Sequence, residues 1–201
     1  MNPVGIFLAA GRGRRFDPTG ERNKLLQPLA GAGAGCESVP VAVASARALL
    51  AVLSKVIAVV RPDDDGVAEA LRALGCDVTV CPDADEGMGA SLAHGVRHSL
   101  PAAQSWLIAL GDMPHLKPST VKVLADAVAG GAVIAAPVTA GKRGNPVAFG
   151  AACLPHLLAL GGDEGARRIL KLYPVTEVAV VDPGIFQDVD CPADLNQGLS
   201  D

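Results

Sequence analysis

Five positively charged side chains lie in one glycine-rich stretch, residues 8–24, which reads LAAGRGRRFDPTGERNK. The cations are Arg12, Arg14, Arg15, Arg22 and Lys24. The backbone N–H groups of a glycine-rich loop can approach phosphate oxygens closely, and Arg and Lys side chains neutralise phosphate charge. The stretch therefore suits a triphosphate, although an arginine-rich surface loop without a ligand has the same composition.

Two common phosphate-binding loops do not fit this stretch. Gly11 and Gly13 supply the first two glycines of the dinucleotide-binding fingerprint, but Phe16 stands in place of the third. Pro18 and Gly20 also disfavour a helix that begins at once. The P-loop ending Gly-Lys-Ser/Thr is absent from the stretch. The interpretation that remains is a triphosphate-binding loop of another kind.

Two acidic residues are candidates for holding a divalent cation. Asp112 follows Gly111 and an apolar run at 105–110, so we expect it at the carboxyl end of a strand, where a carboxylate can hold Mg2+ against phosphate oxygens. A turn-forming role for Asp112 is the alternative. Asp190, in the sequence DVDCPADL, can supply a second metal oxygen, whereas Asp194 fits a helix-capping acid.

Gly87, Gly89 and Ser91 open a predicted helix in the sequence EGMGASLAHGV. Glycines at a helix N-terminus let a base or ribose press against the backbone, and the helix dipole there favours negative charge. A flexible connection between strand and helix is the alternative. His94 and His98 share a helix face at metal-ligand spacing, but the glutamate of a zinc protease is missing between them.

Composition excludes several classes of protein. The 201 residues, half of them hydrophobic, suit a single domain over residues 1–201. A net charge of −4 and an aromatic content of 3% disfavour a nucleic-acid partner, and charges interrupt every apolar run before it reaches membrane-spanning length. The five cysteines are odd in number and form no Cys-x-x-Cys pair, and no signal peptide is evident at the start, so we expect a cytoplasmic protein.

Short apolar runs alternate with segments of helical spacing. Strands are expected at residues 4–10, 55–60, 77–81, 105–110, 132–138, 145–150 and 177–182. Helices are expected at residues 38–53, 63–75, 89–100, 117–131 and 163–173. The alternation predicts an α/β fold with a mostly parallel sheet, helices on both faces, and ligands beyond the carboxyl ends of the strands. Residues 30–35 (AGAGAG) fit a turn, and residues 139–146 fit a hairpin loop.

Six motifs together resemble the MobA-like nucleotidyltransferase family, and within it the molybdenum cofactor cytidylyltransferase (MocA-like) branch. In chain order they are LAAGRGRRF with NKLLQPL behind it, EGMGASL, LGDMP, GNPVAFG, GDEGARRIL and DVDCPADL. The resemblance spans nearly the whole chain. It implies a three-layer α/β/α Rossmann-like fold and transfer of a nucleotidyl group with release of pyrophosphate.

The resemblance also implies roles for residues. Nucleotide-binding residues would be Leu8, Ala9, Ala10, Gly11, Gly13, Arg15, Lys24, Cys81, Gly87, Gly89 and Ser91. Arg15, Lys24 and Asp112 would be catalytic. Asp112 and Asp190 would bind Mg2+. Asn145 and Arg167 would face the acceptor.

Ala10 favours CTP as the donor, because guanylyl-transferring members of the family tend to have a second glycine there. Cys81 departs from the family pattern, since cytidylyl-transferring members often have Asn at this place and a thiol replaces an amide's donors and acceptors poorly. The resemblance implies transfer of CMP to molybdopterin for a molybdenum hydroxylase. The alternatives are GTP as donor, a sugar phosphate as acceptor, and a non-catalytic chaperone that carries the cofactor.

Overall fold

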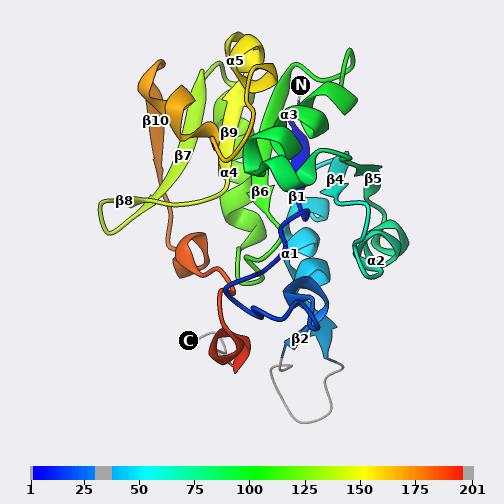
Figure 1. Ribbon diagram of the computed structural model, residues 1–201. Coiled ribbons are helices and arrows are strands. Elements are labelled where there is room, and N and C mark those ends of the chain that lie inside the picture. Colours follow the sequence, from blue (N-terminus) through cyan, green and yellow to red (C-terminus); the bar gives the residue numbers. More distant parts are fainter. Residues whose placement is uncertain (1, 30–37, 197–201) are drawn as a thin grey trace.

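The computed structural model describes residues 2–29 and 38–196, which form a three-layer α/β structure around one large sheet (Figure 1). The strands of this sheet are β1 (Val4–Leu8), β4 (Val56–Val60), β5 (Asp77–Val80), β6 (Ser105–Leu110), β7 (Ile134–Thr139), β8 (Lys142–Arg143), β9 (Val147–Gly150) and β10 (Val175–Ala179). Their order is β10-β7-β9-β6-β1-β4-β5, with β8 paired to β7. β9 and β8 pair antiparallel with their neighbours, and the pairings among the other strands of this sheet are parallel.

Helices cover both faces of the sheet. They are α1 (Val41–Leu50), α2 (Val67–Leu74), α3 (Met88–His98), α4 (Pro118–Ala129) and α5 (Leu154–Leu158). Successive residues of β1 face opposite layers: Phe7 packs in the core with α1, α2 and α4, whereas Ile6 packs in the core with α3 and α5. The predicted α/β fold with a mostly parallel sheet is therefore confirmed.

Short 3-10 turns lie between or after these elements. They are η1 (Lys24–Leu26), η2 (Ala84–Glu86), η3 (Ala151–Cys153), η4 (Ala166–Lys171), η5 (Pro183–Phe186) and η6 (Pro192–Asn196). A small second sheet pairs β2 (Pro28–Leu29) with β3 (Val39–Pro40). Among helices of the described ranges, none is long and apolar enough to cross a membrane.

Several predicted boundaries were wrong. The helix predicted at 163–173 is only the 3-10 turn η4, because Gly165 precedes it and Pro174 stops it. The last strand lies at Val175–Ala179, earlier than the predicted 177–182, and α5 was not predicted. The hairpin expected at 139–146 is present as the tight β7–β8 connection, in which Ala140 and Gly141 both have positive φ. The turn expected at 30–35 lies outside the described residues.

Candidate nucleotide and metal site

Three segments that are distant in the sequence meet beyond the carboxyl ends of β1 and β6. Gly111 N donates to Leu8 O at 2.9 Å, which joins the two strand ends. A Cβ at Gly111 would lie 2.9 Å from Leu8 O, so glycine is required for this approach. Val189 N donates to Asp112 O at 2.8 Å and brings in the segment before η6. The fold therefore places Asp112 where ligands collect in parallel sheets.

Arg15, Lys24, Asp112 and Asp190 form one group, which we call the charged cluster. Lys24 Nζ lies 2.6 Å from Asp112 Oδ2 and 3.8 Å from Asp190 Oδ1, and it donates to Val189 O at 3.0 Å. Arg15 pairs with Asp190 from the solvent side. Only 11% of the Lys24 side chain and 19% of the Asp112 side chain are exposed. The catalytic and metal-binding residues expected from the sequence thus lie together.

The glycine-rich loop is shaped so that Lys24 reaches this cluster. Gly13 has φ +62, and a Cβ there would lie 3.3 Å from Lys24 Cγ, so glycine serves both the turn and the packing of the lysine stem. Phe16 N donates to Gly13 O at 2.9 Å, and the Phe16 ring is buried. Lys24 begins η1, where the Asn23 side chain caps the turn by accepting from Leu25 N.

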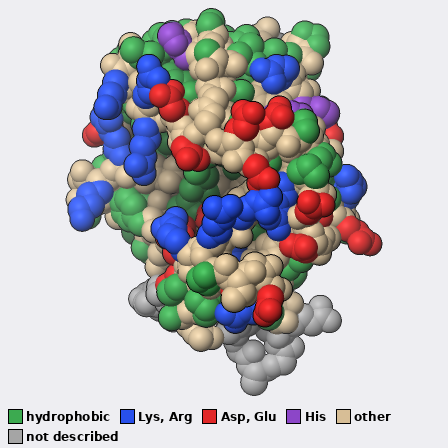
Figure 2. All heavy atoms as spheres, viewed as in Figure 1, with side chains coloured by type: hydrophobic (Ala, Val, Ile, Leu, Met, Phe, Trp, Pro, Cys, Tyr) green, Lys and Arg blue, Asp and Glu red, His purple; other side chains and the backbone are tan. Residues whose placement is uncertain are grey.

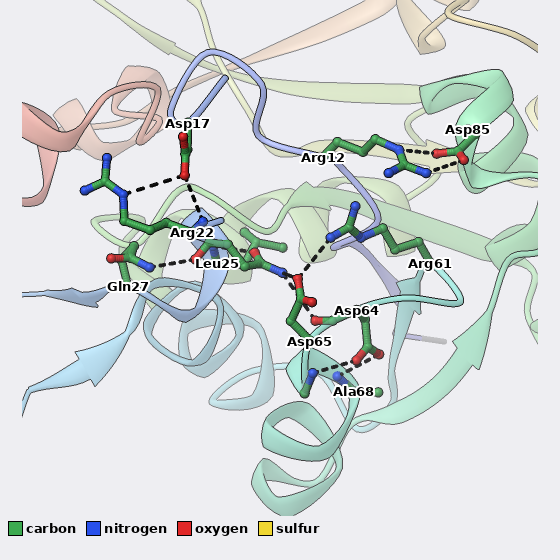
Figure 3. Close-up of polar contacts among 12 residues, drawn as sticks. Arg12, Asp17, Arg22, Leu25, Gln27, Arg61, Asp64, Asp65, Ala68 and Asp85 are labelled. Carbon is green, nitrogen blue, oxygen red and sulfur yellow. Dashed lines mark hydrogen bonds and ion pairs between the residues drawn. The ribbon is translucent and has the colours of Figure 1, made fainter. Parts of the chain in front are cut away.

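Asp17 is a buried acid that the sequence analysis did not identify. Its Oδ1 accepts from the Thr19 hydroxyl at 2.7 Å and from Thr19 N at 3.0 Å. Its Oδ2 accepts from Arg22 N at 2.8 Å (Figure 3). The Thr19 hydroxyl, followed by these backbone donors, lowers the pKa of Asp17 despite its burial. An Asp two residues before a Thr is typical of such a turn, so the signal was present in the sequence. Asp17 fixes the outer part of the glycine-rich loop.

The donor set of the charged cluster fits a hard divalent cation. Asp112 Oδ1 is buried and has no hydrogen-bond partner among residues 2–29 and 38–196. Burial, and then the nearby Asp188, raise the pKa of Asp190, while Arg15 and Lys24 oppose them. In that same part of the chain no three His, Cys, Asp or Glu side chains form a metal cage. Two carboxylates with phosphate oxygens and water as the other ligands is the arrangement that Mg2+ favours.

Gly87 and Gly89 contact protein rather than open space. A Cβ at Gly87 would lie 2.4 Å from Gly162 O, and one at Gly89 would lie 2.6 Å from Glu164 O. Gly89 N donates to Gly162 O at 2.8 Å. Both glycines are therefore required by the packing of segment 161–164 on the start of α3. A contact of this helix start with nucleoside, which the sequence suggested, stays a prediction.

Cys81 and Ser91 are both buried beside this helix start. Burial raises the pKa of the Cys81 thiol, and hydrogen bonds with the Asp83 backbone and then the Ser91 side chain oppose that rise only in part. The thiol is thus neutral at physiological pH. Ala9 and Ala10 are also buried, and Ala9 N extends the β1–β4 ladder by donating to Val59 O at 2.9 Å.

A salt bridge that the sequence analysis did not predict joins the glycine-rich loop to η2. Arg12 Nε donates to Asp85 Oδ1 at 2.6 Å, and a second guanidinium nitrogen binds the other carboxylate oxygen (Figure 3). This pair lowers the pKa of Asp85. The exposed fractions of the two side chains are 44% and 62%, so no burial pattern in the sequence marks them. The loop is consequently held at Arg12 as well as at Lys24.

The two residues assigned to the acceptor do not join the charged cluster. Asn145 N donates to Ile185 O at 3.0 Å, which seats the loop before β9 on η5. Arg167 is exposed and makes no hydrogen bond or ion pair within the described part of the chain. Figure 2 shows Lys and Arg side chains as a band across the middle of one face, with a second group at its left margin.

His94 and His98 have separate partners instead of a shared one. His94 Nε2 lies 2.8 Å from Thr79 Oγ1, and His98 Nε2 lies 3.6 Å from Asp77 Oδ1. Burial, then the neighbouring His98 and Arg97, lower the pKa of His94. These contacts tie α3 to β5 and account for both side chains.

Comparison with known proteins gives matches along almost the full chain. Purine catabolism protein PucB of Bacillus subtilis (strain 168) is 31% identical over 208 residues, which cover 96% of this chain and 94% of PucB. The crystal structure of Rv0371c from Mycobacterium tuberculosis H37Rv superposes with a TM-score of 0.77 at 28% identity, over 96% of this chain and 95% of that one. Rv0371c has also been solved in complex with manganese.

A nucleotidyl transferase from Methanothermobacter thermautotrophicus superposes with a TM-score of 0.76 at 26% identity, over 96% of this chain and 94% of that one. The family model for the MobA-like NTP transferase domain matches residues 5–178. That match includes the glycine-rich loop and Asp112, while Asp190 lies beyond it. On this evidence the chain belongs to the MobA-like NTP transferase family.

Proposed function

We propose that this nucleotidyltransferase moves CMP from CTP to molybdopterin, with Mg2+ and in the cytoplasm, and that residues 1–201 form one catalytic domain. The observation that carries the proposal is the charged cluster, in which Lys24 Nζ lies between the carboxylates of Asp112 and Asp190. Ala10 favours CTP over GTP by the family pattern. PucB acts in purine catabolism by its name, and Rv0371c binds manganese in one of its crystal structures.

In the proposed reaction an oxygen of the acceptor phosphate attacks the α-phosphorus of CTP. The new P–O bond forms as the bond from the α-phosphorus to the bridging oxygen breaks, and that electron pair leaves with pyrophosphate. Arg15 and Lys24 would stabilise the charge that develops on the α-phosphate and on the pyrophosphate. Asp112 and Asp190 would hold Mg2+, which when bound supplies further neutralisation of phosphate charge.

No side chain needs to act as a nucleophile in this scheme. The buried neutral thiol of Cys81 and the hydrogen-bonded His94 are consistent with that, since neither is free to attack. Catalysis would come from positioning and electrostatics.

The experiment supplies radiolabelled CTP, GTP or ATP with molybdopterin and Mg2+, and measures both the labelled dinucleotide and pyrophosphate. We expect product from CTP. Transfer from GTP alone would contradict the cytidylyl assignment, and transfer only to a sugar phosphate would contradict the acceptor. A thermal-shift series with the same nucleotides gives an independent ranking, because a ligand at about 100 times its Kd stabilises the fold by about 2.7 kcal/mol.

A non-catalytic cofactor carrier is separated from the enzyme by Asp112→Ala. A carrier with this substitution should still bind and deliver the cofactor, whereas the enzyme should lose turnover. The matched control is Asp126→Ala, which removes an exposed carboxylate that pairs with Lys122 on α4.

A further inference from the structure

The turn that carries Lys24 is held from the side by the loop after β4. Asn23 Nδ2 donates to Asp65 Oδ2 at 3.0 Å and to Asp64 O at 3.2 Å. The other end of the same side chain, Oδ1, accepts from Leu25 N at 3.0 Å and so caps η1. Asn23 therefore links the backbone next to Lys24 to residues 64 and 65, which are 41 and 42 positions further along the chain.

Asp65 is held in a conformation that favours this contact. Its φ is +58, in the left-handed region that non-glycine residues seldom occupy and that Asp tolerates better than most. The oxygen that accepts from Asn23 also accepts from Arg61 Nη2 at 3.1 Å (Figure 3). Arg61 directly follows β4, and only 14% of its side chain is exposed. The carboxylate of Asp65 thus connects the end of a central strand to the turn of Lys24.

The two acids that precede Asp65, Asp63 and Asp64, make different contacts. Asp64 caps α2, because its Oδ1 accepts from Gly66 N at 2.9 Å and its Oδ2 accepts from Ala68 N at 3.1 Å. Asp63 is exposed and accepts no hydrogen bond from residues within the described ranges. Of the three consecutive acids, Asp65 is the one whose side chain bonds to the glycine-rich loop.

We propose that Asp65 is a positioning residue for nucleotidyl transfer, which acts through Asn23 to fix the turn from which Lys24 reaches the phosphate site. A lysine ammonium sits on a flexible four-carbon stem, so its location depends on how firmly its backbone is anchored. Small displacements of a charge-stabilising group reduce the rate strongly. The test of this inference by kcat/KM rests on the proposed function, whereas its test by chemical labelling of lysines does not.

Two substitutions at Asp65 separate its hydrogen bonds from its backbone conformation. Asp65→Gly removes the carboxylate but accepts positive φ without strain. Asp65→Asn keeps one oxygen, and one oxygen is enough because Asn23 and Arg61 both donate to Oδ2. We expect Asp65→Gly to lower kcat/KM for the nucleotide about tenfold and Asp65→Asn to retain most of the activity. Asp63→Asn is the matched control for loss of one charge from the same loop, and its activity should equal that of the wild type.

A double-mutant cycle tests whether Asp65 acts through Lys24. In a Lys24→Ala background, Asp65→Gly should change kcat/KM by less than about twofold. An equal tenfold loss in both backgrounds would overturn the proposal. Asn23→Asp tests the same hydrogen bond by changing its donor. The substitution keeps the oxygen that accepts from Leu25 N but places a carboxylate oxygen opposite Asp65. It should lower kcat/KM as Asp65→Gly does, and adding Asp65→Asn should restore part of the activity because the new amide can donate to the new carboxylate.

Competitive acetylation of lysines, read by mass spectrometry, needs no catalytic activity. The Lys24 amine should react several-fold faster in Asp65→Gly than in the wild type. Lys55, whose amine pairs with Asp77 at the surface, is the internal reference for the rate. An unchanged Lys24 rate would overturn the proposal. If the wild type transferred no nucleotide to any acceptor, the proposed function would fail while this measurement would still decide the role of Asp65.

Discussion

The charged cluster and the two residues assigned to the acceptor, Asn145 and Arg167, differ in burial and in the number of contacts that their side chains make within the protein. In the cluster, Lys24 is almost fully enclosed and bonds to Asp112 and Val189. Asn145 and Arg167 sit on separate segments, and Arg167 is exposed without a partner among the residues that the structure describes. One region is built around internal ion pairs, whereas the other presents its charge to water.

The proposed function would account for this difference. A triphosphate and a metal concentrate opposite charges in a small volume, and groups fixed in advance stabilise that charge without reorganisation during the reaction. Arg167, in contrast, is exposed, and under the proposed function it would gain an ion pair only when the acceptor binds. We therefore expect substitutions in the cluster to lower kcat and substitutions on the acceptor side to raise KM.

Removal of the Asp112 carboxylate should have the largest effect. Asp112→Ala removes the buried oxygen that has no protein partner and leaves Lys24 without its nearest acid. We expect kcat to fall about 10³-fold, measured by pyrophosphate release at saturating CTP and acceptor. Circular dichroism should show an intact fold. Loss of less than tenfold would mean that the cluster is not where charge develops.

Gly89→Ala should disturb the segment that precedes Arg167, because Gly89 packs against residues 161–164. The new Cβ would lie 2.6 Å from Glu164 O and 2.7 Å from Gly161 O, so backbone must move. We expect a loss of about 1–3 kcal/mol in urea unfolding and a raised KM for the acceptor. Gly161→Ala is the control, since a Cβ there meets nothing within 4 Å. Equal stability of the two variants would contradict the packing described above.

Arg167→Ala should affect the acceptor alone. Loss of one charge-assisted hydrogen bond to a phosphate weakens binding about tenfold, so KM for the acceptor should rise by that factor while KM for CTP stays constant. Tm should not change, because the side chain is exposed. Arg168→Ala, which removes the adjacent cation paired with Glu164, is the comparison. A rise in KM for CTP instead would place Arg167 on the nucleotide side.

Asp17→Asn should have the smallest effect, and one that depends on pH. The folded state lowers the pKa of Asp17, chiefly through the Thr19 hydroxyl, so the stabilisation is present above the ordinary value of 3.8 and is lost as pH falls through the lowered pKa. The variant should melt below the wild type at neutral pH, and the two Tm values should converge under strongly acidic conditions. A constant Tm difference down to acid pH would assign the effect to packing.

The sequence predicted the layers of the fold better than its connections. Alternating apolar runs indicated the central strands, since the two faces of a buried strand leave a simple pattern. The hairpin predicted at residues 139–146 indicated that β9 runs antiparallel to β7, and this is confirmed. No pattern in residues 147–150 shows that β9 inserts between β7 and β6, because strand order depends on where the chain re-enters the sheet. The 163–173 segment has helical spacing, but Gly165 and Pro174 limit it to a 3-10 turn.

The charged cluster of the candidate site was predictable because its members belong to recognisable motifs. Lys24, Asp112 and Asp190 could be named from motifs, and the structure brings them together. Contacts between loops could not be named, since the Asn23–Asp65 hydrogen bond joins exposed or half-exposed side chains with no periodic pattern. Gly87 was interpreted as room for a nucleoside, yet its neighbours are atoms of segment 161–164.

The hydrogen bond from Lys24 to Val189 has a consequence for how the protein acquires its site. The two residues are separated by 165 positions, so closing the loop between them carries a large entropic penalty. A chain that has already formed β1, β4 and β6 during refolding still lacks one of its two carboxylates. The charged cluster is therefore not complete until the segments around residues 24 and 189 have met.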